Sequence, residues 1–341
     1  MTGSGERFFV TGALGCIGAW TVRTLVREGA TVTAFDLGSD NRRLRLIMTP
    51  EELAGVTFVT GDITDLDGLA GAIERSESTN VIHLAALQVP FCRANPPLGA
   101  RVNVVGTVNV FEAVRQRSAT TPMAPIVYTS SIGMYGADDA DPSSGRLRAG
   151  APAHPLNHYG VYKMANEGNA RVYWLDNGIA SVGLRPMTVY GVGRDQGMTS
   201  GPTKAIVAAV LHRPYTVPFQ GATLYQYAGD VARTLIAASR SGTQGSPVYN
   251  LPGEVADGPA ILRAIEAVVP GASEVIRFDP VDLPFPSEID HDGIEALGRI
   301  EVTPLAEGVR ASAETYLALA AAGRLDPAEH GLEPIAVGPT A

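Results

Sequence analysis

Short apolar runs alternate with amphipathic stretches along the first half of the chain. The runs lie at residues 7–11, 31–35, 56–59, 81–84, 125–129 and 180–184. Apolar runs of this length that are bounded by turn residues are typical of buried strands. The stretches between them carry apolar residues at helical spacing, as in 19–28, 104–117 and 159–176. This alternation predicts an α/β fold with a doubly wound parallel sheet that helices cover on both faces.

The pattern changes after Arg185, where Pro and Gly become frequent and the elements become shorter. We therefore expect a first domain at residues 1–185, to which residues 226–252 return. A smaller, interleaved lobe is expected from residues 186–225 and 253–325. Residues 326–341 are rich in Pro and are expected to form a loosely held tail.

Composition narrows the class of protein. A net charge of −9 argues against nucleic acid as a partner, because phosphate binding needs clustered Lys and Arg. Two cysteines, Cys16 and Cys92, do not form a disulfide framework. We find no signal-peptide run, no apolar stretch that would place the chain in a membrane, and no metal motif. We expect a cytoplasmic protein that binds a small molecule.

Three glycines at Gly12, Gly15 and Gly18 follow the first predicted strand and open the first predicted helix. In this context one glycine permits a tight turn, one lets backbone approach a pyrophosphate, and one allows close helix–strand packing. The start of the helix offers unpaired N–H groups to the phosphates. The pattern predicts a bound dinucleotide, and the alternative is a glycine-rich turn without a ligand.

Asp36 ends the second predicted strand, where a carboxylate can accept hydrogen bonds from the adenosine ribose hydroxyls. A carboxylate there also repels a 2′-phosphate, so the sequence favours NAD over NADP. Arg42 and Arg43 follow closely enough to leave NADP open. The alternative interpretation of Asp36 is a turn residue before Gly38.

Tyr159 and Lys163 are spaced i, i+4 and therefore share one face of a predicted helix. We expect the nearby ammonium to lower the pKa of the phenol toward a range useful for proton exchange with an alcohol or carbonyl. Ser131 ends a predicted strand and is placed to hydrogen-bond the reacting oxygen. Such a Tyr–Lys pair also arises by chance on exposed helices. Tyr162 adjoins Lys163 in sequence but points elsewhere around the helix.

Taken together, these motifs resemble the extended short-chain dehydrogenase/reductase family, which includes NAD-dependent sugar epimerases and dehydratases. The resemblance covers nearly the whole chain and rests on motifs that occur in the family's order. These are Thr11-Gly12-x-x-Gly15-x-x-Gly18, Asp62-Ile63, His83-Leu84-Ala85-Ala86, Asn103, Thr129-Ser130-Ser131, Tyr135-Gly136, Tyr159-x-x-x-Lys163 and Leu184-Arg185-Pro186-x-x-Val189-Tyr190-Gly191.

The resemblance implies a Rossmann domain followed by a substrate lobe. It implies Tyr159 as general acid/base, Lys163 as its partner and ribose ligand, and Ser131 as a ligand of the substrate oxygen. The cofactor-binding residues that we derive from the motifs are Gly12, Gly15, Cys16, Ile17, Gly18, Asp36, Asp62, Ile63, Leu84, Ala85, Ala86, Asn103, Tyr159, Lys163, Pro186 and Val189. A homodimer through helices 104–117 and 159–176 is expected by the same analogy.

At several positions the sequence differs from the family's motifs, and these differences limit the activities that we expect. Ile132 and Gly133 stand where dehydratase-like members carry Asp-Glu, so sugar dehydration is disfavoured. Thr188 replaces an Asn typical of members that act on nucleotide sugars. No Arg precedes the motif at Asp230, which weakens the clamp for a diphosphate. A smaller substrate without a nucleotide fits these changes better.

The leading hypothesis is an NAD-dependent dehydrogenase or ketoreductase acting on a secondary alcohol or ketone, such as a free sugar or sugar acid. The alternative enzyme is a sugar 4-epimerase, and a third interpretation is a regulatory protein that senses NAD without catalysis. The predicted substrate-pocket residues are Gln88, Ser131, Met134, Thr188, Thr199, Tyr225 and Gln226.

Overall fold

A seven-stranded parallel sheet forms the centre of the computed structural model, which describes residues 5–141, 143 and 146–332. Its strand order is β11-β7-β5-β4-β1-β2-β3, which confirms the predicted doubly wound α/β fold. The strands are β1 (Arg7–Thr11), β2 (Thr31–Asp36), β3 (Val56–Thr60), β4 (Asn80–His83), β5 (Ile126–Thr129), β7 (Ser181–Arg185) and β11 (Val248–Asn250).

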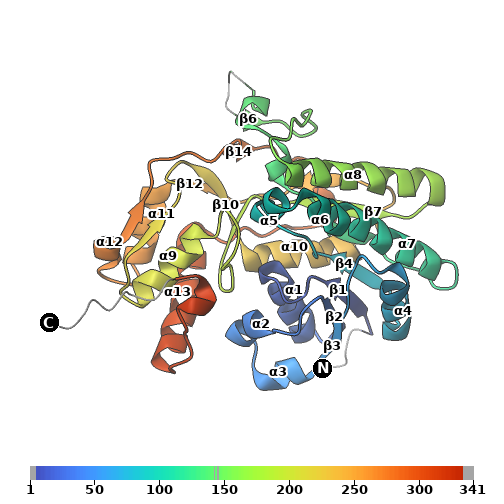
Figure 1. Ribbon diagram of the computed structural model, residues 1–341, viewed down its shortest axis with the longest axis horizontal. Helices are drawn as coiled ribbons and strands as arrows, with labels where there is room; N and C mark the ends of the chain where they lie inside the picture. The colour runs from blue at the N-terminus through green and yellow to red at the C-terminus, as the bar shows by residue number, and fades with distance from the viewer. Residues whose placement is uncertain (1–4, 142, 144–145, 333–341) are drawn as a thin grey trace.

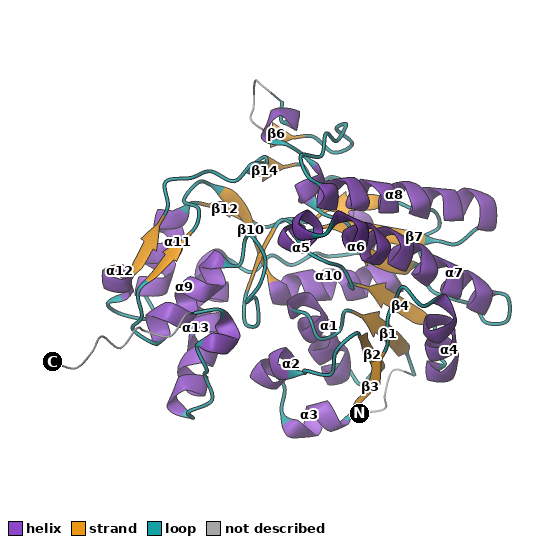
Figure 2. Cartoon of the chain, in the orientation of Figure 1, coloured by secondary structure: helices purple, strands orange, loops and turns teal. Residues whose placement is uncertain are grey.

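Helices cover both faces of this sheet (Figures 1 and 2). Phe8 and Val10 of β1 join the core cluster that includes residues of α1 (Cys16–Arg27) and α10 (Ala228–Arg240). Phe9, between them, joins the opposite cluster with residues of α4 (Leu66–Ser76), α7 (Gly106–Ser118) and α8 (His158–Asn177). The strand pleat thus sends neighbouring apolar side chains to different faces, which is why uninterrupted apolar runs form this sheet.

The second lobe lies beside the carboxyl ends of the strands, at the left of Figure 1. Its helices are α9 (Gly201–Val210), α11 (Gly258–Glu266), α12 (Ala272–Val275) and α13 (Leu305–Ala321). A three-stranded sheet in this lobe contains β8 (Thr188–Tyr190), β10 (Thr223–Tyr227) and β12 (Glu254–Ala256). One strand pair joins β9 (Tyr215–Val217) to β13 (Ile276–Phe278). Another pair joins β6 (Arg146–Leu147) to β14 (Glu288–Ile289). One apolar core continues from the sheet into this lobe.

Short helices complete the rim of the sheet: α2 (Arg42–Ile47), α3 (Pro50–Ala54), α5 (Val89–Ala94) and α6 (Pro96–Ala100). A π-helical turn, Arg101–Val105, leads into α7. Because all seven strands are parallel, the residues that follow β1 to β5 meet at one edge of the sheet. Within the described ranges, no helix is both long and apolar enough to cross a membrane.

The predicted tail at 326–341 lies partly outside the described residues. Where it is described, His330 and Leu332 are buried, and the His330 ring packs edge-on against Tyr316 with 5.3 Å between the ring centroids. This part of the tail is therefore held against α13, which corrects the expectation that the whole tail is loose.

Candidate active site and cofactor pocket

The turn between β1 and α1 leaves no room for a side chain at Gly12 or Gly18. Gly12 has φ +68°, and a Cβ there would lie 2.5 Å from the backbone nitrogen of Ala85. A Cβ on Gly18 would lie 2.2 Å from the carbonyl oxygen of Gly12. Gly15 is the N-cap of α1, and no side chain in the described structure caps the helix there. The first backbone N–H groups of α1 therefore remain available to an anion.

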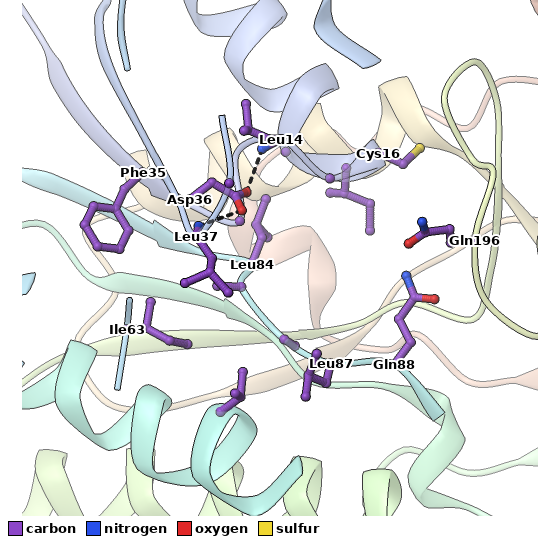
Figure 3. Close-up of a pocket in the computed structure, with 18 of the residues that line it drawn as sticks. Leu14, Cys16, Phe35, Asp36, Leu37, Ile63, Leu84, Leu87, Gln88 and Gln196 are labelled. Atoms are coloured by element: carbon purple, nitrogen blue, oxygen red, sulfur yellow. Dashed lines mark hydrogen bonds between the residues drawn. The ribbon is translucent and has the colours of Figure 1, made fainter. Parts of the chain in front are cut away.

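This loop lines a cavity of about 540 Å³ at the carboxyl edge of the sheet, a volume typical of ligand pockets. Figure 3 shows Asp36 toward one end of the cavity and Gln88 with Gln196 at the other. Eleven of the predicted cofactor residues line it: Gly12, Gly15, Cys16, Ile17, Gly18, Asp36, Asp62, Ile63, Leu84, Ala85 and Ala86.

Asp36 is held by the backbone at the end of β2. Its carboxylate accepts hydrogen bonds from the N–H groups of Leu14, at 2.9 Å, and Leu37, at 2.8 Å (Figure 3). Arg43 also lines the cavity, but its guanidinium donates to the buried carboxylate of Asp195 at 2.8 Å. Arg42 donates to the same carboxylate at 3.3 Å. Both guanidinium groups are thus paired within the protein.

Five of the predicted cofactor residues do not line the cavity: Tyr159 and Lys163, which lie on α8, and Asn103, Pro186 and Val189. Asn103 is buried and brackets Leu87, accepting from its N–H at 2.7 Å and donating to its carbonyl at 2.8 Å. The carbonyl of Pro186 accepts from the N–H of Ile132 at 3.1 Å, and Val189 is buried in the core. Asn103 and Pro186 therefore shape loops that border the site.

A smaller cavity of about 90 Å³ adjoins the first and contains Ser131 and Tyr159. Ser131 Oγ accepts from the N–H of Gly133 at 3.0 Å, which leaves its hydroxyl proton free to donate. A Cβ on Gly160 would lie 2.7 Å from the carbonyl oxygen of Gly133, so the start of α8 packs directly on the Ser131 turn. This close approach brings Tyr159 and Ser131 into one pocket although they come from α8 and the end of β5.

Burial dominates the proton chemistry of the pair on α8. The pKa of Tyr159 is raised by burial, an effect that the Ser131 hydroxyl and the charge of Arg194 partly offset. The expectation of a lowered Tyr159 pKa is therefore wrong. Lys163 is buried, and its Nζ donates to the Thr129 carbonyl at 2.6 Å. Burial lowers the pKa of Lys163 to about 8.

A charged cluster that sequence reasoning missed fixes the end of β5 against α8. Glu167 accepts from Ser130 Oγ at 2.5 Å. The same carboxylate accepts from Arg185 Nε at 2.7 Å and Nη2 at 2.6 Å. Glu167 lies one turn after Lys163, and that spacing on the catalytic face was the available signal. The cluster holds the residue before Ser131 in place.

The structure brings Gln88 and Thr199 to the small cavity with Ser131, but not the other four predicted substrate residues. Thr188 Oγ1 is bonded to Thr223 Oγ1 at 2.8 Å, across the β8–β10 pair. Gln226 accepts from the Met187 N–H and donates to the Leu251 carbonyl, both at 2.8 Å. Met134 and Tyr225 are buried in the core clusters. Thr188 and Gln226 are therefore hydrogen-bonded within the protein, and Met134 and Tyr225 are packed in its core.

Sequence reasoning missed most of the small cavity's wall, which comes from distant loops. The additional lining residues are Val89, Gly133, Met187, Arg194, Gly197, Met198 and Phe285. Arg194 also lines the large cavity. The sequence signal for Arg194 was the run Gly191-Val192-Gly193-Arg194. In the structure both of these glycines adopt positive φ.

Residues 8–251 match the sequence profile of the NAD dependent epimerase/dehydratase family. The chain belongs to this family of NAD-dependent enzymes, as the fold and the glycine, serine, tyrosine and lysine motifs had indicated. The profile covers nearly the whole parallel sheet, and both cavities except for Phe285.

Two relatives illustrate the range of the match. The chain is 30% identical over 319 residues to UDP-glucose 4-epimerase of Mycolicibacterium smegmatis, in a match that covers 91% of this chain and 98% of that protein. It is 34% identical over 194 residues to UDP-glucuronate 4-epimerase 2 of Arabidopsis thaliana. That match covers 56% of this chain and spans only 43% of the plant protein's length.

Solved structures with the same fold include both an epimerase and a dehydrogenase. UDP-glucose 4-epimerase of Thermus thermophilus in complex with NAD aligns with a TM-score of 0.75 at 26% identity, over 91% of this chain and 99% of that one. A partial consensus L-threonine 3-dehydrogenase aligns with a TM-score of 0.78 at 25% identity, over 92% and 100%.

Proposed function

We propose that the protein is an NAD-dependent dehydrogenase or ketoreductase that acts on a secondary alcohol or ketone of a small molecule without a nucleotide, such as a free sugar or sugar acid. The size of the cavity beside Ser131 and Tyr159, about 90 Å³, carries this proposal. Among the described residues that line this cavity, Arg194 is the only cation. A nucleotide diphosphate would need more room and more positive charge than this cavity offers.

The residues of the large cavity fit a dinucleotide. The uncapped start of α1 and the bare glycine backbone would hold the pyrophosphate, and Asp36 would accept from the adenosine ribose hydroxyls. When bound, the nicotinamide supplies or accepts the hydride. Asp36 favours NAD over NADP, and the guanidinium groups of Arg42 and Arg43 that follow it in the chain are already paired with Asp195.

The protein's own residues handle the proton. In the oxidation direction Tyr159 removes the proton of the substrate hydroxyl, and in reduction it returns it. Ser131 donates its hydroxyl proton to the reacting oxygen, while its own oxygen accepts from the Gly133 N–H. Lys163 carries its charge below pH 8 and favours the phenolate form of Tyr159 in the loaded site.

A sugar 4-epimerase is the second candidate. The match to the mycobacterial UDP-glucose 4-epimerase over nearly both full lengths favours it. An epimerase would use the same Ser131, Tyr159 and Lys163 but would return the hydride to the opposite face of its own intermediate. It would therefore retain NAD firmly and release no net NADH.

The test is absorbance near 340 nm with purified protein, NAD, and a panel of free sugars, sugar acids and secondary alcohols. We expect NADH formation, and we expect Tyr159→Phe to reduce it about 100- to 10,000-fold while NAD binding is retained. Tyr162→Phe is the matched control, because Tyr162 lies on the same helix but donates to the Pro96 carbonyl at 2.8 Å. Equal losses in both variants would assign the effect to helix packing and count against the proposed role.

A further inference from the structure

Arg194 and Gln88 stand where the large and small cavities meet, since these two residues line both. Arg194 Nη2 donates to Thr199 Oγ1 at 3.4 Å. The lining of the small cavity, as far as the structure describes it, contains no carboxylate to balance Arg194. The charge of Arg194 therefore faces the space beside Ser131 and Tyr159 without a carboxylate in the described lining of that cavity.

The backbone that carries Arg194 is fixed by three helices. Trp20 of α1 donates from its indole N–H to the Val192 carbonyl at 3.0 Å. The Gly193 N–H donates to the Tyr316 hydroxyl of α13 at 3.0 Å. Asp195, the next residue, binds Arg42 and Arg43 of α2. Asp195 is thus paired on the α2 side, and the backbone on both sides of Arg194 is held in place.

Two buried polar atoms at this junction have no hydrogen-bond partner among the described residues: Nε of Arg194 and Oε1 of Gln88. Both side chains approach Gly197, which adopts φ +100°. A Cβ on Gly197 would lie 2.6 Å from Gln88 Oε1 and 3.1 Å from Arg194 Nη2. Leaving a buried donor and a buried acceptor unpaired costs free energy, so such a pair is expected to meet a ligand that offers both.

We propose that Arg194 and Gln88 form a subsite for a hydroxy acid, in which Arg194 binds the carboxylate and Gln88 accepts from a neighbouring hydroxyl. This inference rests on the proposed function and narrows its substrate class to small hydroxy acids, such as sugar acids. The planar guanidinium matches a carboxylate in a bidentate geometry. The reacting hydroxyl, on another carbon of the same substrate, then falls toward Ser131 and Tyr159 in the same cavity.

The experiment measures binding to the full chain saturated with NAD, by calorimetry, for matched pairs of aldonates and alditols with the same number of carbons. We expect at least one aldonate to bind about 10- to 100-fold more tightly than its alditol, the value of one hydrogen bond to a charged group. Arg194→Gln should abolish this preference and leave the dissociation constant for NAD unchanged. Arg310→Gln, at an exposed position of α13, is the control and should bind as the wild type does.

A second variant tests the same subsite independently, in case Arg194→Gln does not fold. Gln88→Glu keeps the size of the side chain but places a carboxylate beside the bound acid, so aldonate binding should be lost and any alditol binding kept. If no acid binds more tightly than its neutral partner, the subsite is overturned. If Arg194→Gln instead weakens NAD binding, Arg194 is a ligand of the cofactor phosphates and the proposal also falls.

These outcomes are separable from the fate of the proposed function. NADH formed from neutral alcohols but from no acid would leave the dehydrogenase proposal standing and remove the hydroxy-acid subsite. Tight acid binding that depends on Arg194, without NADH from any member of the panel, would support the subsite and contradict the dehydrogenase.

Discussion

At the scale of one residue, the buried ammonium of Lys163 lowers the stability of the fold but places a positive charge near Tyr159. Its ammonium is buried, with a 2.6 Å hydrogen bond to the Thr129 carbonyl. Burial lowers its pKa from the ordinary value of 10.5 to about 8. A buried lysine is costly to the stability of the fold, and the proximity of Lys163 to Tyr159 explains why it lies there.

The linkage between this pKa and stability gives a prediction for Lys163→Met. Between pH 8 and 10.5 the unfolded lysine is protonated while the folded one is not, so the wild type gains stability as pH rises through this window. Below pH 8 the perturbed lysine costs about 3 kcal/mol, which the methionine variant avoids. We expect the variant's advantage in unfolding free energy, measured by denaturant titration without NAD, to shrink from about pH 7.5 to about pH 10. A difference that stays constant with pH would contradict the lowered pKa of Lys163.

Residue chemistry was predictable from sequence only where local spacing decides it. The spacing of Tyr159 and Lys163 on one helix placed them correctly on one face. The direction of the Tyr159 pKa shift was not predictable, because burial raises this pKa more than the Ser131 hydroxyl and the charge of Arg194 lower it. Thr188 and Gln226 are likewise bonded to partners that the β8–β10 pairing and Leu251 supply.

At the scale of elements, the β1–α1 loop is the feature on which cofactor binding depends. Gly18→Ala would place a Cβ 2.2 Å from the Gly12 carbonyl oxygen, so the loop and α1 must move apart. We expect at least a roughly tenfold loss of NAD affinity and a stability loss of about 1–3 kcal/mol. Calorimetric NAD titration and denaturant unfolding measure the two effects.

Gly168→Ala is the matched control for this prediction. Gly168 lies inside α8, and no described neighbour comes within 4 Å of the Cβ it would gain. This variant should keep NAD affinity and gain about 0.5–1 kcal/mol of stability, because alanine favours the helix interior. Equal NAD affinity in the Gly18→Ala protein would contradict the proposed role of the loop.

Elements were well predicted where the apolar pattern is strong and poorly where it is short. Six of the seven strands of the main sheet coincide with predicted apolar runs, and the seventh, β11, lies within residues 226–252. The helix expected at 104–117 is α7 preceded by a π-helical turn, which the pattern does not distinguish. The strand pairs β6–β14 and β9–β13 join short segments from distant parts of the chain, so local sequence carries no signal for them.

At the scale of the whole molecule, α8 exposes a stripe of apolar side chains. Val161, Met164, Val172 and Leu175 are 42%, 41%, 51% and 62% exposed. Their spacing places them along one side of the helix, and an exposed apolar stripe of this length is typical of a protein interface. This supports the prediction of a homodimer through α7 and α8.

Sedimentation at micromolar concentration tests the homodimer. We expect a dimer for the wild type and a monomer for Leu175→Glu, because a charge within an apolar interface is left unpaired. Leu317→Glu, at an exposed position of α13 in the second lobe, is the control and should remain dimeric. A wild type that sediments as a monomer would rule out this assembly.

A direct test of dehydrogenase activity is to count the NADH molecules formed per active site with excess NAD and the best substrate of the panel. We expect many turnovers, each releasing NADH and an oxidised product, and we expect Tyr159→Phe to lose this signal. No net NADH, with NAD retained through purification and a substrate converted to its epimer, would contradict the dehydrogenase and establish the epimerase.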